Sequence, residues 1–298
     1  MTFNRPRPTK RVFDQIKKVK PQRLYIASDG PRVSKEGEKS LVSEIRENLL
    51  SAVDWNCEVK TLFRDRNLGC GHAVSEAVTW FFNNEEMGII LEDDCLPSLS
   101  FFFFCDQLLN EYKDDEQVFL ISGDNRSSSS ISIVEDYAFI KYPLIWGWAS
   151  WRRVWNNYDF QISRWPQLKS KIMSSFELSG TKRYWYQAFE TIYNQDEKKS
   201  WGYQLCFSCL SQQKKCIVPA KNLISNIGYG SDATHTIMED KLSSNIEIFE
   251  LDLPVKLLKE KSNNTKVENW LDRNIFYFPS IIERVIRKFK SVLTHTWL

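Results

Sequence analysis

The amino-acid sequence predicts an α/β fold in which helices flank both faces of a mostly parallel central sheet. Short apolar runs alternate with stretches whose apolar residues recur at helical spacing, which is the pattern of β-α-β units. One run, residues 88–91, is continuously apolar, as expected for a strand that is covered on both faces. The chain has 298 residues and is 42% hydrophobic, which is enough for a large core.

The alternation can be followed along the first half of the chain. Apolar residues at helical spacing predict helices at residues 9–19, 41–53, 74–81 and 101–112. Apolar runs bounded by turn residues predict strands at residues 24–27, 59–63, 88–91 and 118–122. A first strand is expected before residues 4–6, where residues 1–3 leave room only for a short one. Beyond about residue 142 the pattern changes to helices with long loops, so we expect one domain, residues 1–278, with a helix- and loop-rich second half.

Composition argues against several classes of protein. The net charge is +2, from 40 basic and 38 acidic residues, without the basic excess of a nucleic-acid-binding protein. The seven cysteines are an odd number and follow no secretory signal, which favours a reduced, cytoplasmic compartment. Cys206 and Cys209 are spaced like half of a zinc site, but they lie in an apolar run without a second pair, which favours buried helical thiols. No apolar run approaches the ~20 residues that cross a bilayer.

The end of the chain, residues 279–298, predicts an amphipathic helix. Ser280 and Glu283 match a capping box, and an apolar stripe follows with Arg and Lys residues beside it. Docking on the core is the ordinary role of such a helix. The alternative is a peripheral contact of residues 280–298 with the inner face of the membrane, through attraction to anionic lipid.

Three acids, Glu92, Asp93 and Asp94, follow the most apolar predicted strand. Adjacent carboxylates raise one another's pKa unless a cation or a donor relieves them. Mg²⁺ and Mn²⁺ take oxygen ligands and also bridge phosphates, and ligands of open α/β sheets bind at the carboxyl ends of strands. A solvated acidic turn is the common alternative, but apolar residues on both sides weigh against it. The pattern therefore favours a metal–phosphate site.

Other polar residues are expected at the same edge of the sheet. Asp29 ends a predicted strand, where its carboxylate could accept from a base or a ribose. Arg5, Arg64 and Arg66 lie in or near strand-end loops and could contact phosphate oxygens. Residues 67–72, from Asn67 to His72, lead into a helix whose N-terminal amides favour anions. Each signal alone is weak, and their joint placement is the stronger observation.

These residues carry a resemblance to a known group. The run Ile89-Ile90-Leu91-Glu92-Asp93-Asp94 resembles the Glu-Asp-Asp form of the DxD motif of GT-A glycosyltransferases, in particular the N-acetylglucosaminyltransferase I group and related bacterial nucleotide-diphospho-sugar transferases. The likeness extends over most of the chain. Its further runs are residues 3–6, 28–32, 67–71, 121–125, 145–151 and 226–236.

The resemblance implies a GT-A (Rossmann-like) fold and roles for particular residues. Residues 1–126 would form the nucleotide-sugar-binding half and residues 127–278 the acceptor-side half. Asp94 would ligate the metal, Mn²⁺ or Mg²⁺. Trp146 and Trp148 could line the acceptor site. Donor-binding roles are expected for Arg5, Asp29, Arg64, Asn67, His72, Glu92, Asp93, Thr234 and His235.

One departure concerns the catalytic base of an inverting transfer. The group usually carries an acid after a Trp near Ser200, and this chain has Gly202 at that place. The base is therefore unassigned, with candidates Asp124, Asp196, Glu197 and Asp232. General-base catalysis contributes ~10²–10⁴-fold, so its loss would be damaging without abolishing donor binding.

The sequence predicts a metal-dependent transferase. It would move a sugar from a nucleotide-diphosphate donor, most simply a UDP-sugar, to a bacterial surface-glycan or lipid-linked acceptor. One alternative is a catalytically impaired homologue that only binds the sugar nucleotide. Another is a sugar-phosphate nucleotidyltransferase, which residues 4–8 disfavour because they lack a glycine-rich phosphate loop.

Overall fold

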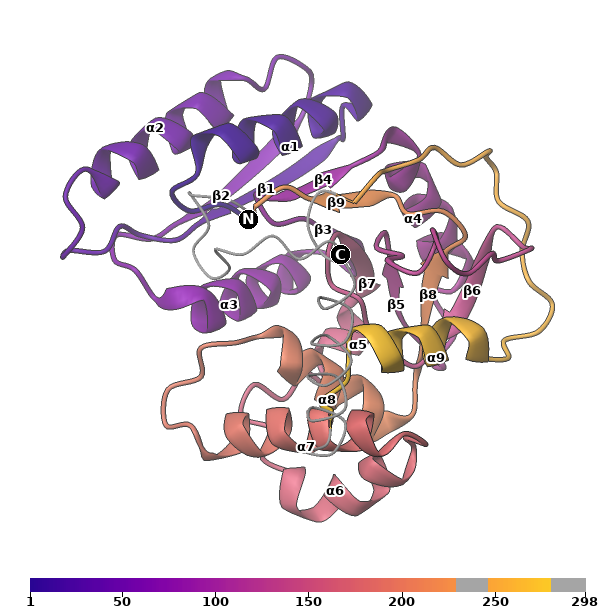
Figure 1. The fold of residues 1–298 in the computed structure, drawn as a ribbon. Coiled ribbons are helices and arrows are strands. Elements are labelled where there is room, and N and C mark those ends of the chain that lie inside the picture. The colour runs from indigo at the N-terminus through magenta and orange to yellow at the C-terminus, as the bar shows by residue number, and fades with distance from the viewer. Residues whose placement is uncertain (229–245, 280–298) are drawn as a thin grey trace, which may run out of the picture.

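The computed structural model describes residues 1–228 and 246–279 and shows a mixed α/β fold. The first unit is a parallel pair of strands, β1 (Arg23–Ser28) and β2 (Glu58–Phe63). Helices α1 (Pro6–Val19) and α2 (Glu38–Ser51) lie on one side of this pair, and α3 (Gly69–Asn84) lies on the other (Figure 1). Apolar residues of α1, β1 and α2 form a small core of their own between these elements.

The central sheet has five strands in the order β3-β7-β5-β8-β6 and is mixed. They are β3 (Met87–Ile90), β5 (Val118–Ser122), β6 (Tyr137–Ile140), β7 (Trp148–Trp151) and β8 (Lys215–Pro219). Of its four pairings only β5–β8 is parallel. The expectation of a mostly parallel central sheet is thereby corrected. The reason is that β7, from a segment expected to hold helices and loops, inserts between β3 and β5 and runs antiparallel to both.

Helices cover the remaining sheet and build the second half of the chain. Helix α4 (Leu99–Glu111) packs on β3 and β7, and α5 (Arg152–Trp155) follows β7 directly. Helices α6 (Trp165–Ser174), α7 (Ser179–Asn194) and α8 (Gly202–Gln212) pack on one another below the sheet in Figure 1. Helix α9 (Thr265–Asn274) contacts α7 and β6. A small antiparallel pair joins β4 (Cys95–Pro97) to β9 (Ile224–Asn226).

The predicted elements of the first half are all present, with ends shifted by a few residues. The exception is the expected first strand. Residues 1–3 make only an isolated parallel bridge, between Thr2 and Ser28. The amide of Thr2 donates to the carbonyl of Ala27 (2.9 Å), and the amide of Asp29 donates to the carbonyl of Thr2 (3.2 Å). This bridge places Arg5 at the carboxyl end of β1.

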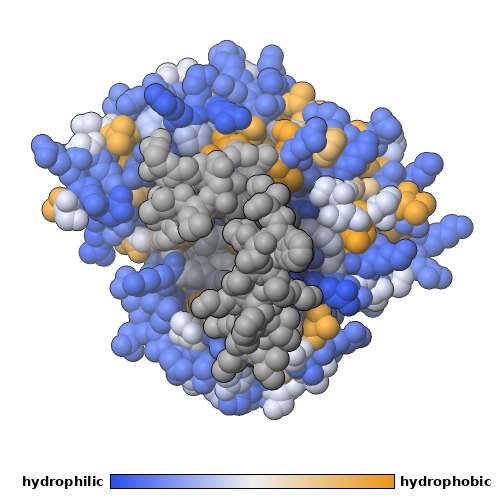
Figure 2. All heavy atoms as spheres, viewed as in Figure 1, coloured by the Kyte–Doolittle hydropathy of each residue, from blue (hydrophilic) through white to orange (hydrophobic). Residues whose placement is uncertain are grey.

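Further expectations from the sequence concern two cysteines, membrane-spanning helices and the end of the chain. Cys206 and Cys209 are buried, free thiols on α8, as the apolar run predicts. In the described part of the chain, no helix has the length and apolar character needed to cross a membrane. The face shown in Figure 2 is largely hydrophilic, with apolar residues scattered over it in small groups. The amphipathic segment at residues 280–298 lies outside the described residues.

Candidate functional site

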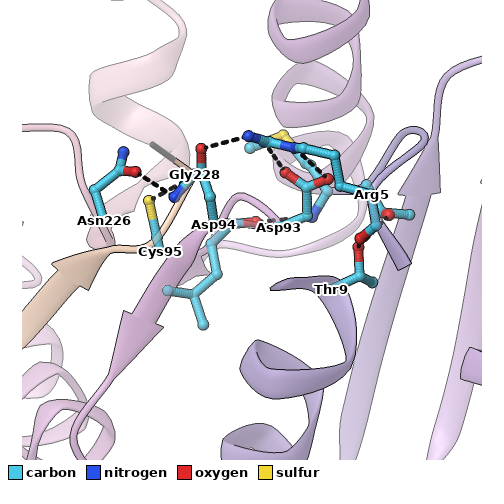
Figure 3. A network of polar contacts seen from close by, with 10 residues as sticks. Arg5, Thr9, Asp93, Asp94, Cys95, Asn226 and Gly228 are labelled. Carbon is cyan, nitrogen blue, oxygen red and sulfur yellow. Dashed lines mark hydrogen bonds and ion pairs between the residues drawn. The ribbon is translucent and has the colours of Figure 1, made fainter. Parts of the chain in front are cut away.

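The acidic turn lies where the apolar strand leaves the sheet. Strand β3 ends at Ile90, the turn holds Glu92, Asp93 and Asp94, and β4 starts at the next residue. The guanidinium of Arg5 lies between two of these acids (Figure 3). It forms an ion pair with Asp93, with Nε 3.4 Å from Oδ2, and its NH1 lies 3.0 Å from Oδ2 of Asp94.

Burial makes this group of charges strongly interdependent. Burial raises the pKa of Glu92 to about 8, with Asp94 and Asp93 adding to the effect. Burial and the Asp94 charge also raise the pKa of Asp93, against the lowering effect of Arg5. For Arg5, burial lowers the pKa but the two aspartates more than offset this, so its pKa lies above the ordinary value. The single cation of Arg5 therefore balances only part of the acidic turn.

The chain returns to this turn at the end of β9. The amide of Ile227 donates to the carbonyl of Asp94 (2.8 Å), and the amide of Gly228 donates to Oδ1 of Asn226 (2.9 Å). A Cβ atom at Gly228 would overlap the carboxylate of Asp94 and lie 2.6 Å from a guanidinium nitrogen of Arg5. Glycine is therefore required at this position by the close approach of its backbone to the acidic turn.

The acidic turn faces a cavity of about 440 Å³, which we call the first cavity. It lies at the carboxyl ends of β1 and β3, the position where open α/β sheets bind ligands. Carboxylates, guanidinium groups and the aromatic rings of Phe3 and Trp146 share its wall. The structure brings together here the sequence-predicted residues Arg5, Asp29, Arg64, Asn67, Glu92, Asp93, Asp94 and Trp146.

Asp29 is more fully bonded than expected. Its carboxylate accepts from the amide of Gly30 (2.8 Å), the side-chain amide of Asn67 (2.8 Å) and the amide of Leu68 (3.0 Å). Leu68 is the residue that caps α3, so this carboxylate already neutralises part of the helix N-terminus that was expected to attract an anion. Asp29 therefore shapes the cavity wall and holds the Asn67 amide in place.

Two charged side chains that sequence reasoning missed, partly buried Arg46 and buried Glu38, support the same wall. Arg46 of α2 donates to Oγ of Ser28 (3.0 Å) and to the carbonyls of Asp29 (3.1 Å) and Arg64 (2.7 Å). It thereby joins the ends of β1 and β2. Buried Glu38 accepts from the amide of Arg32 (2.6 Å) and from the side-chain amide of Asn4 (2.9 Å). Arg46 sits at a polar position of the helix predicted at residues 41–53, and Glu38 precedes that helix, so periodicity alone gave no signal for them.

A second cavity, of about 810 Å³, adjoins the first. Both are lined by Cys70 and Trp146, so these two side chains form a shared wall. The rest of the second cavity is largely aromatic and apolar, and it contains two cations, Arg126 and Lys199. Its aromatic side chains are Trp146, Tyr184, Trp185, Trp201, Tyr203, Phe276 and Phe278. Gly202, where the resemblance places an acid, also lines it, and a Cβ atom there would lie 2.5 Å from Cδ1 of Ile145.

Several predicted residues lie outside both cavities. His72 packs its ring 4.7 Å from that of Phe160 and lies 4.0 Å from Glu76, so it does not line the donor side. Trp148, expected on the acceptor side, is 1% exposed and stacks with Trp155 and Trp201 in the core. Its acceptor role is thus corrected: β7 lies in the middle of the sheet, and all four of its residues are buried.

The candidate bases are dispersed. Asp196 and Glu197 are exposed in the loop before α8, and neither lines a cavity, although Gln195 and Lys199 beside them do. Asp124 is fully buried after β5, and burial raises its pKa. Its Oδ2 lies 3.1 Å from Nε of Arg126, without the alignment of a hydrogen bond. Asp232, Thr234 and His235 lie outside the described residues.

The described part of the chain holds no complete set of protein ligands for a metal. Across residues 1–228 and 246–279, no three His, Cys, Asp or Glu side chains are grouped as metal ligands. Asp94 is nevertheless suited to share an ion with a phosphate, because its side chain is 16% exposed at the first cavity. Mg²⁺ is commonly held by one or two carboxylates together with substrate phosphates. The donor set therefore fits a metal that arrives with a nucleotide.

Comparison with known proteins adds no family. A scan against protein-family models gives no match, and a search of curated proteins gives none either. The class of protein is therefore inferred from the fold and from the side chains that meet at the two cavities.

Proposed function

We propose that this protein is a metal-dependent glycosyltransferase of the GT-A type. It would bind a nucleotide-diphosphate sugar, most simply a UDP-sugar, in the first cavity and a glycan or lipid-linked acceptor in the second. The observation that carries the proposal is that the acidic turn and Arg5 face one cavity, which shares Trp146 and Cys70 with a second, aromatic cavity. Two adjoining cavities of different chemistry suit a donor and an acceptor that must meet.

The division of the chain supports this assignment. Apart from Trp146, Asn226 and Gly228, every described residue that lines the first cavity comes from residues 1–126. Apart from Cys70 and Arg126, every one that lines the second comes from residues 127–278. The proposed donor side and acceptor side thus follow the two halves of the sequence, and the chain would act in the cytoplasm as one domain.

The chain's own residues would orient the donor. Arg64 lines the first cavity, and its guanidinium is paired with Glu76 at 2.8 Å, which leaves it positioned for a phosphate oxygen. Asn67 is fixed by Asp29, and Glu92 and Asp93, which line the same cavity, would contact ribose or sugar hydroxyls. Asp94 would hold Mn²⁺ or Mg²⁺ together with the diphosphate. When bound, such an ion acts as a Lewis acid that stabilises the charge of the departing diphosphate.

Binding of a metal ion at Asp94 would depend on Arg5. Its guanidinium pairs with the carboxylate of Asp94, which would hold the metal. A metal ion alone must compete with it, whereas a metal with a diphosphate brings anionic oxygens that Arg5 can contact instead. Metal and nucleotide are therefore expected to bind together.

Calorimetric titration tests the proposal. UDP-N-acetylglucosamine, UDP-glucose and UDP-galactose are titrated with Mn²⁺ and, separately, with EDTA. We expect at least one to bind only with Mn²⁺, and the affinity to fall at least tenfold, or about 1.4 kcal/mol, in Asp94→Asn. The matched control is Asp114→Asn, at an exposed acid outside the first cavity. Binding that ignores both the metal and Asp94 would contradict the proposed donor site.

A second candidate function rests on Gly202. Glycine, not an acid, stands at this point of the second cavity. Among the described residues, leaving out the chain neighbours of Gly202, the side chain of Ile145 is the one within 4 Å of the missing Cβ. This favours a homologue that binds the sugar nucleotide without transferring it. Metal-dependent release of UDP from the donor, measured by hydrolysis over hours, separates the two functions, since hydrolysis shows that the leaving group is still activated.

A further inference from the structure

Among the described residues, the charged side chains that line the second cavity are all cations. They are Arg126 and Lys199, and no Asp or Glu of the described chain lies on the same wall. The first cavity differs, because four carboxylates line it together with its guanidinium groups. The second cavity is therefore the more positive of the two and favours a ligand of opposite charge.

Arg126 is held at this cavity by the turn that follows β5. Of residues 121–127, Arg126 is the one that lines the second cavity, and its neighbours on both sides are buried. The amide of Asn125 donates to Oδ1 of Asn222 (2.9 Å), and its side-chain amide donates to the carbonyl of Pro219 (2.7 Å). These bonds fix the backbone that carries Arg126.

Two further contacts orient the guanidinium of Arg126. Its Nε lies 3.1 Å from Oδ2 of Asp124, a buried carboxylate that does not line the cavity and that offsets part of the charge. Its Cζ lies 4.3 Å from the ring centroid of Trp146, on the wall that the two cavities share. The contact with Asp124 is made by Nε, so the terminal nitrogens, which carry most of the N–H donors, suit a forked contact with an anion.

Lys199 adds a second cation from the loop before α8. Its side chain is exposed, and none of the ion pairs among the described residues includes it. The loop is anchored by the preceding Lys198, which is buried and donates from Nζ to the carbonyls of Tyr193 (3.2 Å) and Gln195. Lys198 thus holds the loop, while the charge of Lys199 is available to a ligand.

The rest of the wall suits a ligand that is apolar as well as charged. Tyr184 and Tyr203 both line the cavity, with their hydroxyl oxygens 3.0 Å apart. One hydroxyl proton is used in the bond between them, so the other O–H can donate to a ligand. The neighbouring aromatic rings offer flat apolar faces. Together these groups fit an amphiphilic anion better than a free inorganic ion.

We propose that the second cavity binds an acceptor with a negatively charged group, a phosphate ester or a carboxylate, which contacts Arg126. Because Arg126 lies against Trp146, the charge would be on the sugar that receives the transfer or on the unit next to it. Lys199 would attract the same group electrostatically. The proposal rests on the proposed sugar transfer for the word acceptor, whereas the anion site itself is testable without donor or metal.

The test compares three small ligands with the full chain in EDTA. Phenyl β-D-glucuronide and phenyl β-D-glucoside differ only in that the first has a carboxylate, and phenyl phosphate represents a phosphate ester. The Kd of each is measured by NMR titration. We expect at least one anion to bind about tenfold more tightly than the glucoside, as for a charge-assisted hydrogen bond. Tighter binding of phenyl phosphate would assign a phosphate ester to the acceptor, and tighter binding of the glucuronide would assign an acidic sugar.

Two variants locate the anion in the second cavity. Lys199→Met, at an exposed side chain, should weaken binding of the preferred anion about threefold. Its matched control is Lys182→Met, at an exposed lysine of α7 that does not line the cavity. The double variant Asp124→Asn/Arg126→Met removes both buried charges together, so that neither is left unpaired, and should abolish the preference for the anion.

Several results would overturn the proposal. They are equal or undetectable binding of the three ligands, a preference for the anion that survives both variants, and a preference that is lost in Arg64→Met, since Arg64 lines the first cavity. The donor titration fails or succeeds separately. Anion preference without UDP-sugar binding supports the anion site and removes the sugar transfer, whereas UDP-sugar binding without anion preference does the reverse.

Discussion

Replacing Arg5 with methionine tests whether its guanidinium is the counter-charge of the acidic turn. Methionine keeps much of the side-chain volume and removes the charge. The side chains of Arg5 and Asp93 are 17% and 6% exposed, so the acids lose their cation in a largely dry setting. Removing one partner of a buried ion pair costs about 3–5 kcal/mol. Because Arg5 is partly exposed, we expect a loss at the lower end of this range, a fall of about 3 kcal/mol in the free energy of unfolding.

Thermal unfolding in EDTA measures this loss, which corresponds to a midpoint about 6 °C lower. Arg7→Met is the matched control, because Arg7 lies exposed on the same helix. Excess Mn²⁺ should restore part of the stability of Arg5→Met, by about 2.7 kcal/mol at a hundredfold excess over Kd. Wild type without nucleotide should respond little, since Arg5 already pairs with the carboxylate of Asp94, which the proposed ion would have to share.

Two results would refute this reasoning. A loss no larger than that of Arg7→Met would show that Asp93 and Asp94 are neutralised by something other than Arg5. An equal response of wild type and Arg5→Met to Mn²⁺ would show that the guanidinium and the cation do not compete for Asp94.

Three further predictions concern the same region. In Gly228→Ala the new methyl group would overlap the carboxylate of Asp94, and such overpacking costs about 1–3 kcal/mol. The Mn²⁺-dependent affinity for the donor, measured by calorimetry, should therefore fall at least about tenfold. An unchanged affinity would contradict the close approach of Gly228 to Asp94. Gly202→Glu combined with Ile145→Ala supplies an acid and the space for it. If a missing base limits the reaction, the rate of sugar transfer in a product assay should rise by about 10²-fold or more over that of Ile145→Ala alone. Burial, with Asp94 and Asp93 nearby, raises the pKa of Glu92 in the folded protein to about 8. Because this pKa is higher than that in the unfolded chain, the free energy of unfolding falls as the pH rises between the two values. Denaturant unfolding in EDTA should therefore show stability falling between about pH 4.5 and about pH 8, and Glu92→Gln should lack that part of the fall.

The sequence was sufficient to locate the acidic turn because the relevant signals are local. A continuous apolar run followed at once by three acids predicts a buried strand that ends in carboxylates. The structure has a strand that leads into these acids at β3, although Ile90 is the one of its four residues that is buried. The neighbouring loops were also placed correctly at the first cavity, since Asp29 and Asn67 follow strands whose carboxyl ends meet at one edge. Parallel β1 and β2 make this geometry predictable from order alone.

Strand order in the central sheet could not be inferred in the same way. Nothing local to residues 148–151 distinguishes a strand that inserts between β3 and β5 from one at an edge. Trp146 and Trp148 illustrate the consequence, because they are two residues apart and the same type. Trp148 is held in the sheet centre, whereas Trp146, just before the strand, lies on the wall between the cavities.

Polar contacts between residues far apart in the sequence could not be predicted from it either. Arg46 and Glu38 occupy ordinary polar positions of a helix, and their importance arises only when β1, β2 and residues 30–37 are brought together around them. Asp29 was expected to contact a ligand, yet most of its hydrogen-bonding capacity is used by Gly30, Asn67 and Leu68. Such pairings depend on tertiary placement, which a residue's own neighbours in sequence do not encode.

The wall between the two cavities depends on a chain of contacts that begins in the sheet. Asp124 follows the central strand β5, is fully buried and pairs with Arg126. The guanidinium of Arg126 lies 4.3 Å from the ring centroid of Trp146, the side chain that both cavities share. A buried carboxylate therefore fixes the cation that supports the dividing ring. Because that carboxylate does not line either cavity, the structure favours positioning of Trp146, rather than proton transfer, as the role of Asp124.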